Sequence, residues 1–176
     1  MTEIFGILNV TRDSFSDGGR WLEPAAAIAR GLQLVAEGAH VIDVGAVSTH
    51  PDSEDVSAAE ELRRLEPVVG ELLARRARIS VDTWRPEVIG AMVALGVEFI
   101  NDVTALADPR SVAAVREARA RIVLMHNTAP GARAVREAFP RAVERVAHFF
   151  ERRLAELEAA GVARERLVLD PGMGFF

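Results

Sequence analysis

Polar side chains stand where successive apolar segments of the sequence end, and their types are those that recognise ligands. Asp82, Asn101 and Asp170 each close a short run rich in Val, Ile or Leu. Carboxylates accept hydrogen bonds, whereas an amide both donates and accepts them. Because buried carboxylates without partners are costly, a deep pocket that held them would need a donor-rich ligand or nearby arginines. These side chains therefore suit a flat heterocycle that carries N–H donors and a carbonyl.

Each of these side chains also has a purely structural explanation. Asp and Asn commonly cap helices and start turns, and Asp82 could form an ion pair with Arg85 instead of meeting a ligand. A purely structural role is less plausible for all of these residues together than for any one of them. A pterin has the kind of edge that such a set of acceptors would recognise.

Two loops that follow strand ends carry further candidate groups. The first, residues 9–19, is long and polar and ends in two glycines, which is typical of a mobile lid. Asn9 at its start offers one neutral oxygen, which suits Mg2+ that keeps its waters and contacts diphosphate oxygens; a turn-forming Asn is the alternative. The second loop brings Ser48, Thr49 and His50 toward the same end, where they suit phosphate or carboxylate recognition.

The elements that must position these residues alternate along the chain. Short Val- and Ile-rich runs alternate with segments of helical period, which favours a parallel sheet or barrel. The carboxyl ends of the strands form the active-site face of such folds, so the polar residues should converge there. The predicted strands span residues 4–10, 40–45, 79–82, 97–101, 121–125 and 166–170.

Local signals mark the helix boundaries. Ser57 can cap a helix over residues 57–75, and Glu60 can reach back to the cap amide. The longest predicted helix covers residues 133–160, with a break near Pro140. Prolines suited to the first helical position and glycines suited to a left-handed helix end are Pro24, Pro86, Pro109, Gly38, Gly96 and Gly161.

A barrel of this kind usually has eight strands and roughly 250 residues, whereas this sequence of 176 residues predicts six strands. We therefore expect an α/β fold, a TIM-type barrel with about six of the eight βα units. Residues 1–176 are expected to form one domain. An open doubly wound sheet is the alternative.

Composition excludes several classes of protein. The net charge is −5, and the 21 basic residues, all arginine, are scattered among acidic ones, which argues against a nucleic-acid binder. No cysteine is present for a disulfide or a thiolate metal site. No apolar run approaches the roughly 20 residues of a membrane-spanning helix, and the start lacks the pattern of a signal peptide. We expect a cytoplasmic protein that binds neither membranes nor nucleic acid.

Residues 5–19, Phe-Gly-Ile-Leu-Asn-Val-Thr-Arg-Asp-Ser-Phe-Ser-Asp-Gly-Gly, resemble the signature of the dihydropteroate synthases. Further blocks similar to those of this family follow in the same order, at residues 42–45, 48–51, 80–83, 100–102, 124–126 and 169–175. The resemblance implies a transferase of folate synthesis, which joins 6-hydroxymethyl-7,8-dihydropterin diphosphate to p-aminobenzoate and releases diphosphate. It also implies Mg2+ and, for a full-length chain, a possible homodimer.

The resemblance also implies roles for individual residues. Asn9 would contact Mg2+ and diphosphate, and Thr49 the diphosphate side. The pterin ring would be held by Asp82, Asn101 and Asp170, with Met125 packed against it. The lid would carry Asp13, Phe15 and Asp17, and Pro51 would lie at the p-aminobenzoate opening. The further substrate-binding residues would be His50, Gly174 and Phe175.

The sequence departs from the family pattern in three ways. His50 stands where the second loop usually has arginine, Arg12 replaces a common proline, and no lysine occurs anywhere. The second loop, residues 19–21 and the ending are more similar to the sulfonamide-insensitive branch of the family. Two alternatives remain: an inactive pterin-binding fragment, and a pterin-dependent methyltransferase, whose first loop lacks the Asp-Ser-Phe-Ser-Asp run.

Overall fold

The computed structural model describes residues 2–10, 24–47, 56–127 and 141–173. Strands and helices alternate along these segments. The strands are β1 (Phe5–Asn9), β2 (Val41–Gly45), β3 (Ile79–Asp82), β4 (Phe99–Asp102), β5 (Arg121–Met125) and β6 (Leu167–Asp170). The helices are α1 (Pro24–Ala36), α2 (Ala58–Ala74), α3 (Pro86–Leu95), α4 (Pro109–Arg116) and α5 (Ala142–Ala159), with a 3-10 turn, η1 (Arg164–Arg166).

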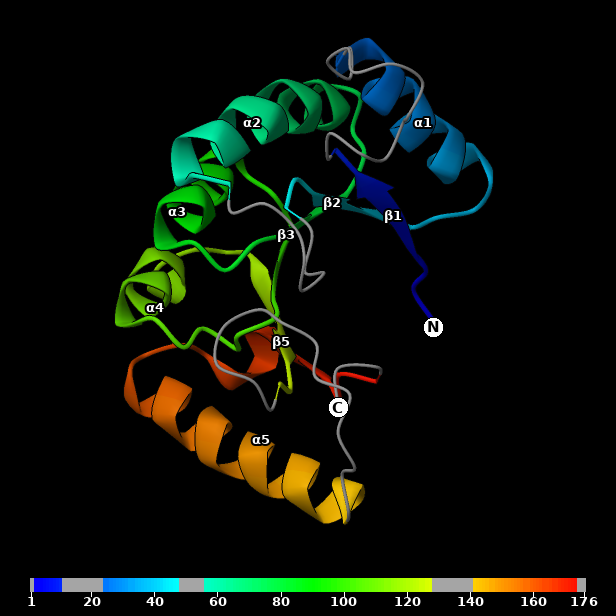
Figure 1. The fold of residues 1–176 in the computed structure, drawn as a ribbon. Helices are drawn as coiled ribbons and strands as arrows, with labels where there is room; N and C mark the ends of the chain where they lie inside the picture. The colour runs from blue at the N-terminus through cyan, green and yellow to red at the C-terminus, as the bar shows by residue number, and fades with distance from the viewer. Residues whose placement is uncertain (1, 11–23, 48–55, 128–140, 174–176) are drawn as a thin grey trace.

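The strands form one parallel sheet in the order β1-β2-β3-β4-β5-β6. The helices follow one another in an arc along the outer side of this curved sheet (Figure 1). A doubly wound sheet would need a reversal of strand order and helices on both faces, so the predicted barrel-type α/β fold is confirmed over its six strands and the alternative is excluded.

The local signals in the sequence mark the observed boundaries well. The Ser57 hydroxyl accepts a hydrogen bond from the amide of Glu60 at 3.2 Å at the start of α2. Pro24, Pro86 and Pro109 are the first residues of α1, α3 and α4. Gly96 ends α3 with a φ of 91°, as predicted. The predicted helix over 133–160 begins at Ala142 among the described residues, and its expected break at Pro140 lies outside them.

The core lies between the sheet and the helices. Strand residues that face the helices, among them Ile42, Val81, Ile100 and Leu124, are fully buried. Burying a side chain of this size stabilises the fold by about 1.5–3 kcal/mol. The side chains that alternate with them face the interior of the curved sheet, where the polar residues lie.

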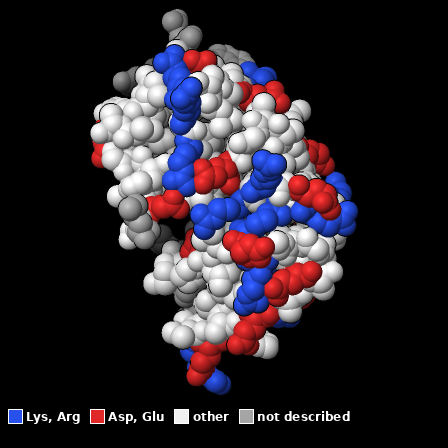
Figure 2. All heavy atoms as spheres, turned by 180° about the vertical axis from the view of Figure 1, so that it is seen from behind, with Lys and Arg blue, Asp and Glu red and all other residues white. Residues whose placement is uncertain are grey.

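Charged residues cluster at the amino-terminal ends of the strands. Arg78 pairs with Glu3 and with Glu98, each at 2.6 Å, and the guanidinium of Arg121 lies 4.9 Å from the centre of the Phe99 ring. Basic and acidic side chains are interspersed over the face turned away from the viewer of Figure 1, as Figure 2 shows. None of the described helices is both long and apolar enough to cross a bilayer.

The two edge strands of the described sheet expose apolar side chains. Ile7 on β1 is 70% exposed although it points to the interior side, and Leu169 on β6 is 44% exposed. By contrast, Leu124 on the adjacent strand β5 faces the helices and is fully buried. Among the described residues, the central strands are thus fully covered and the two edge strands only in part.

Gly6 on β1 allows α1 to approach the sheet, and this makes a stability prediction. A Cβ at Gly6 would stand 2.9 Å from Cβ of Ala39 and 3.2 Å from Cβ of Leu34. Gly6→Ala should therefore lower the free energy of unfolding by about 1–3 kcal/mol, because two packed elements must separate. Chemical denaturation followed by circular dichroism measures this change.

Gly70 provides the matched control. It lies inside α2, and a Cβ there would meet nothing within 4 Å. Gly70→Ala should raise the free energy of unfolding by up to about 1 kcal/mol through helix propensity alone. Equal effects of the two substitutions would show that close packing at Gly6 is unimportant.

Candidate functional site

Four residues from four strands form one row at the carboxyl end of the sheet. In the parallel register Asn9 pairs with Gly45, Gly45 with Asp82, and Asp82 with Asn101. Residues in one register row of a parallel sheet point to the same face. Asn9, Asp82 and Asn101 therefore share the interior side, although the chain separates them widely.

Gly45 lets the side chains on either side of it converge. A Cβ at this position would stand 3.7 Å from Oδ1 of Asn9 and 3.7 Å from Oδ2 of Asp82. A larger residue would occupy the space between the two oxygens. The amide oxygen of Asn9 and the carboxylate of Asp82 thus lie on either side of Gly45.

Met125 and Asp170 form a second register pair at the same end of the sheet. The Asp170 side chain accepts a hydrogen bond from the amide of Gly172 at 2.8 Å, and its carbonyl accepts one from the amide of His126 at 2.8 Å. Gly172 has a φ of +75°, and a Cβ there would lie 2.1 Å from the His126 carbonyl oxygen. The Asp-Pro-Gly sequence therefore forms a tight turn that only glycine permits at this position.

Asp43, near the end of strand β2, belongs to this cluster. The Asn101 amide nitrogen donates to Oδ2 of Asp43 at 3.1 Å, and Oδ1 of Asp43 is buried with no hydrogen-bond partner among the described residues. Asp43 precedes Gly45 by two positions on β2 and so faces the same side.

The acidic groups influence one another electrostatically. Burial, together with the nearby charges of Asp43, Asp102 and Glu61, raises the pKa of Asp82 to about 8. Burial also raises the pKa of Asp43, against the hydrogen bond from Asn101. Oδ1 of Asp82 is buried and lacks a hydrogen-bond partner within the described part of the chain. The site is therefore rich in acceptors that a donor-bearing ligand would satisfy.

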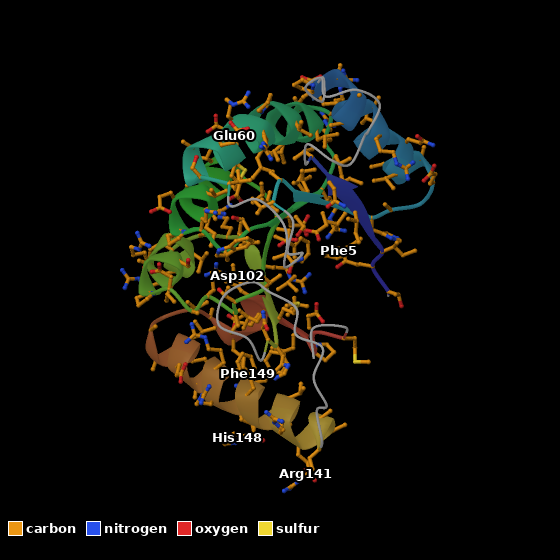
Figure 3. All side chains as sticks on the ribbon, viewed as in Figure 1. Phe5, Glu60, Asp102, Arg141, His148 and Phe149 are labelled. Carbon is orange, nitrogen blue, oxygen red and sulfur yellow. The ribbon has the colours of Figure 1, made fainter. Side chains whose placement is uncertain are left out.

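Two structural explanations offered by the sequence can now be assessed. Arg85 forms an ion pair with Glu61 at 3.0 Å, whereas the sequence suggested Asp82 as its partner. Asp102 faces the helices and accepts hydrogen bonds from the amides of Thr104 at 2.7 Å and Leu106 at 3.1 Å. Asp102, labelled in Figure 3, thus shapes the loop after β4 and belongs to the turn rather than to the interior face.

Apolar side chains lie beside the polar row. Val103 and Met125 are buried and form a small cluster separate from the main core, and Trp84 packs against it. All three follow or end strands β3, β4 and β5. Trp84 and Val103 were missed by sequence reasoning, because an aromatic or branched residue after a strand end carries no signal of its partner.

Comparison with known proteins identifies the family. Residues 5–176 match the family described as pterin binding enzyme. The chain belongs to this family. It is 45% identical to the dihydropteroate synthase type-3 of Escherichia coli over the whole chain and 68% of that protein, and 44% identical to the type-2 enzyme of the same organism over 98% of the chain and 64% of that protein.

Solved structures of pterin-binding enzymes agree with the fold. The chain superimposes on the Xanthomonas albilineans dihydropteroate synthase with 4-aminobenzoic acid with a TM-score of 0.89 and 44% identity. It matches the Burkholderia cenocepacia enzyme complexed with 7,8-dihydropteroate with a TM-score of 0.87 and 32% identity. The first of these matches covers 98% of this chain and 62% of the Xanthomonas enzyme. The chain spans roughly two thirds of the length of its relatives.

Several expected site residues lie outside the described residues. They are Asp13, Phe15, Asp17, Thr49, His50, Pro51, Gly174 and Phe175. His126, another strand-end candidate, is buried at 4% exposure, and its ring packs edge-on against Phe149 with centroids 5.0 Å apart. In Figure 3 Phe149 points from α5 toward the strands and His148 points away.

The donor set for a cation is small. Within the described segments no three His, Asp or Glu side chains are grouped so that they could hold a metal by themselves. Asn9 and Asp82 offer an amide oxygen and a carboxylate on either side of Gly45. One or two protein oxygens completed by ligand phosphates and water are what Mg2+ commonly accepts, so the residues fit that ion and do not form a complete cage.

The raised pKa of Asp82 predicts a pH-dependent stability. The pKa of Asp82 is near 8 in the folded state, and its ordinary value is 3.8. Between these pH values the unfolded chain has lost the proton while the folded chain still holds it. Asp82 therefore lowers the free energy of unfolding as pH rises from 3.8 to about 8. Asp82→Asn removes the cost. The variant should gain stability over the parent as pH rises from 5 to 8, by about 1–3 kcal/mol in total, and the gain should level off above pH 8.

Urea denaturation at several pH values measures this difference. Asp108→Asn is the control, because Asp108 is a helix cap whose pKa is lowered by Arg110 and should give a constant difference over the same range. A flat profile for Asp82→Asn would contradict the buried, proton-holding state of this carboxyl.

Proposed function

We propose that this chain forms the larger part of a dihydropteroate synthase. It would bind 6-hydroxymethyl-7,8-dihydropterin diphosphate and p-aminobenzoate and join them with release of diphosphate. The observation that carries the proposal is a set of acceptors on one face of the sheet beside an apolar wall. Asp82 and Asn101 share a register row, and Asp170 lies next to Met125 two positions further along the strands. We call these three residues the acceptor row. The relatives named dihydropteroate synthase, and the bound 4-aminobenzoic acid and 7,8-dihydropteroate of two of them, support the proposal.

The acceptor row explains how a pterin would be recognised. Oδ1 of Asp82 is a buried acceptor without a partner among the described residues, and a ligand N–H would supply the missing hydrogen bond. The amide nitrogen of Asn101 is used by Asp43, so its carbonyl oxygen is the group left for a second ligand donor. Asp170 adds a carboxylate from β6, and Met125 would contact the flat ring.

The proposed reaction requires little covalent chemistry from the protein. The amine nitrogen of p-aminobenzoate forms a bond to the pterin methylene carbon, the bond from that carbon to the diphosphate oxygen breaks, and the amine loses a proton. The protein's contribution is to hold both partners in line and exclude water. Bound Mg2+ would neutralise charge on the departing diphosphate, and Asn9 is the residue proposed to contact it.

The remaining assignments stay proposals. The lid residues Asp13, Phe15 and Asp17 would cover the diphosphate, and Thr49, His50 and Pro51 would face it and the p-aminobenzoate opening. Gly174 and Phe175 would extend the pterin side after Asp170. One domain over residues 1–176, a cytoplasmic location, homodimers of a full-length chain and weak sulfonamide binding are proposed on the sequence alone.

A second candidate is an inactive pterin-binding fragment. The chain spans about two thirds of the length of its relatives, and the exposure of Ile7 and Leu169 leaves the edges of the described sheet partly uncovered. A pocket can bind one substrate while lacking groups that the reaction needs. Binding and turnover must therefore be measured separately.

Calorimetric titration with 6-hydroxymethyl-7,8-dihydropterin diphosphate, with and without Mg2+, tests the proposal. We expect binding that Mg2+ strengthens, followed by formation of 7,8-dihydropteroate when p-aminobenzoate is added. Binding without product would support the fragment. An absence of pterin binding under all conditions would reject both readings.

Two substitutions test the acceptor row itself. Asp82→Ala and Asp170→Ala should each weaken pterin binding by at least about tenfold, since each removes an acceptor for ligand donors. Asp108→Ala is the control, because Asp108 caps α4 on the surface and should leave the affinity unchanged. Affinities equal to that of the parent in both site variants would remove these two residues from the pocket.

A further inference from the structure

The apolar wall beside the acceptor row is connected to a buried ion pair that the proposed chemistry does not use. The ring of Trp84, two residues after Asp82, packs against Val103 and Met125. These three residues come from the ends of three neighbouring strands. The orientation of the Trp84 ring therefore affects the shape of the wall that Met125 presents.

The guanidinium of Arg85 lies over the Trp84 ring. Its guanidinium carbon lies 5.0 Å from the ring centre, within the range of a cation–π contact. Arg85 is also the last residue before α3, and its amide nitrogen lies 3.4 Å from the Thr83 hydroxyl oxygen. The arginine is thus part of the short loop that leads from Asp82 to the helix.

Glu61 fixes the position of Arg85. Oε2 of Glu61 accepts from Nη1 of Arg85 at 3.0 Å, and the Glu61 side chain is fully buried whereas that of Arg85 is 16% exposed. Glu61 lies in the first turn of α2, where the helix dipole favours a negative charge. Burial raises its pKa, and a hydrogen bond with the Thr83 side chain and the charge of Arg85 oppose this rise. A carboxylate is rarely buried in this way unless it is paired.

We infer that Glu61 is a positioning residue for the pocket: through Arg85 it fixes the Trp84 ring, which supports the Met125 wall against which the pterin packs. The inference rests on the proposed function for the identity of the ligand. Glu61 itself does not touch the substrate. Loss of its charge should remove this ion pair from Arg85, change the position of the guanidinium over the Trp84 ring and weaken recognition of the pterin while the acceptor row stays intact.

Four variants separate positioning from general stability. Glu61→Gln keeps the size and removes the charge. Arg85→Lys keeps a charge for Glu61 and removes the planar group that covers the ring, which provides a test if Glu61→Gln does not fold. Trp84→Ala removes the ring itself. Glu71→Gln is the matched control, since Glu71 lies on the same helix and pairs with Arg75 at the surface.

The first measurement is made without ligand. The sequence has two tryptophans, so Trp21→Phe leaves Trp84 as the only one. In that background Glu61→Gln and Arg85→Lys should shift the emission of Trp84 to longer wavelength, and Glu71→Gln should not. This readout is independent of the identity of the ligand.

The second measurement is the affinity for 6-hydroxymethyl-7,8-dihydropterin diphosphate by calorimetry. Glu61→Gln should weaken binding by about five- to tenfold, and this loss should largely disappear in the Trp84→Ala background, because the ring is then absent. A role in stability alone would give the same loss in both backgrounds and would overturn the inference.

The outcomes separate the two proposals. If the parent chain binds no pterin, the proposed function is wrong and the emission of Trp84 alone decides the positioning role. If the parent binds and Glu61→Gln and Arg85→Lys leave both emission and affinity unchanged, the positioning role is wrong and the proposed function stands.

Discussion

The register of the parallel sheet is the constraint on which the site depends. Asn9, Gly45, Asp82 and Asn101 stand in one row only because each strand pairs with the next at one particular offset. A slip of one residue in any of these pairings would turn a whole set of side chains to the other face. Ile42, Val81 and Ile100 oppose such a slip, since it would expose them from the core beneath the helices. Hydrophobic burial on one face thus places the polar groups on the other.

The same arrangement concentrates acidic groups at a cost in stability. Asp43 and Asp82 each have a buried oxygen with no hydrogen-bond partner in the described residues, and burial raises the pKa of both carboxyls. A protein optimised for stability alone would replace such groups, because neutral or apolar residues avoid the desolvation cost. The proposed pterin would supply donors to them, and the well-packed core around the strands offsets their cost.

Residues that do not face the interior of the sheet support the apolar wall of Val103, Met125 and Trp84. The Asp102 carboxylate accepts from Thr104 and Leu106 and so fixes the loop that carries Val103. Arg153 on α5 donates to the Ala105 carbonyl oxygen at 2.8 Å and so holds the same loop from outside. Helix, loop and strand end are therefore connected by directional contacts, which limit how far the apolar wall can move. A rigid wall reduces the entropy lost on binding.

The sequence by itself determined the order and class of the elements and many of their ends. Strands Ile79–Asp82 and Arg121–Met125 match the predicted bounds, and the Ser57 cap and the Gly96 helix end follow from interactions a few residues apart. The strand predicted to start at residue 97 begins at Phe99, because the Val97 amide is used by the Met92 carbonyl at the end of α3.

Only the tertiary structure decided which polar groups meet. Asn101 donates to Asp43 across 58 positions of sequence, and Arg85 pairs with Glu61 across 24. No short-range pattern in the sequence indicates that Arg85 pairs with Glu61 and not with Asp82, since both are carboxylates that an arginine could bind. The choice follows from how α2 packs on the sheet and from the register, which are properties of the whole core and leave no mark in neighbouring residues.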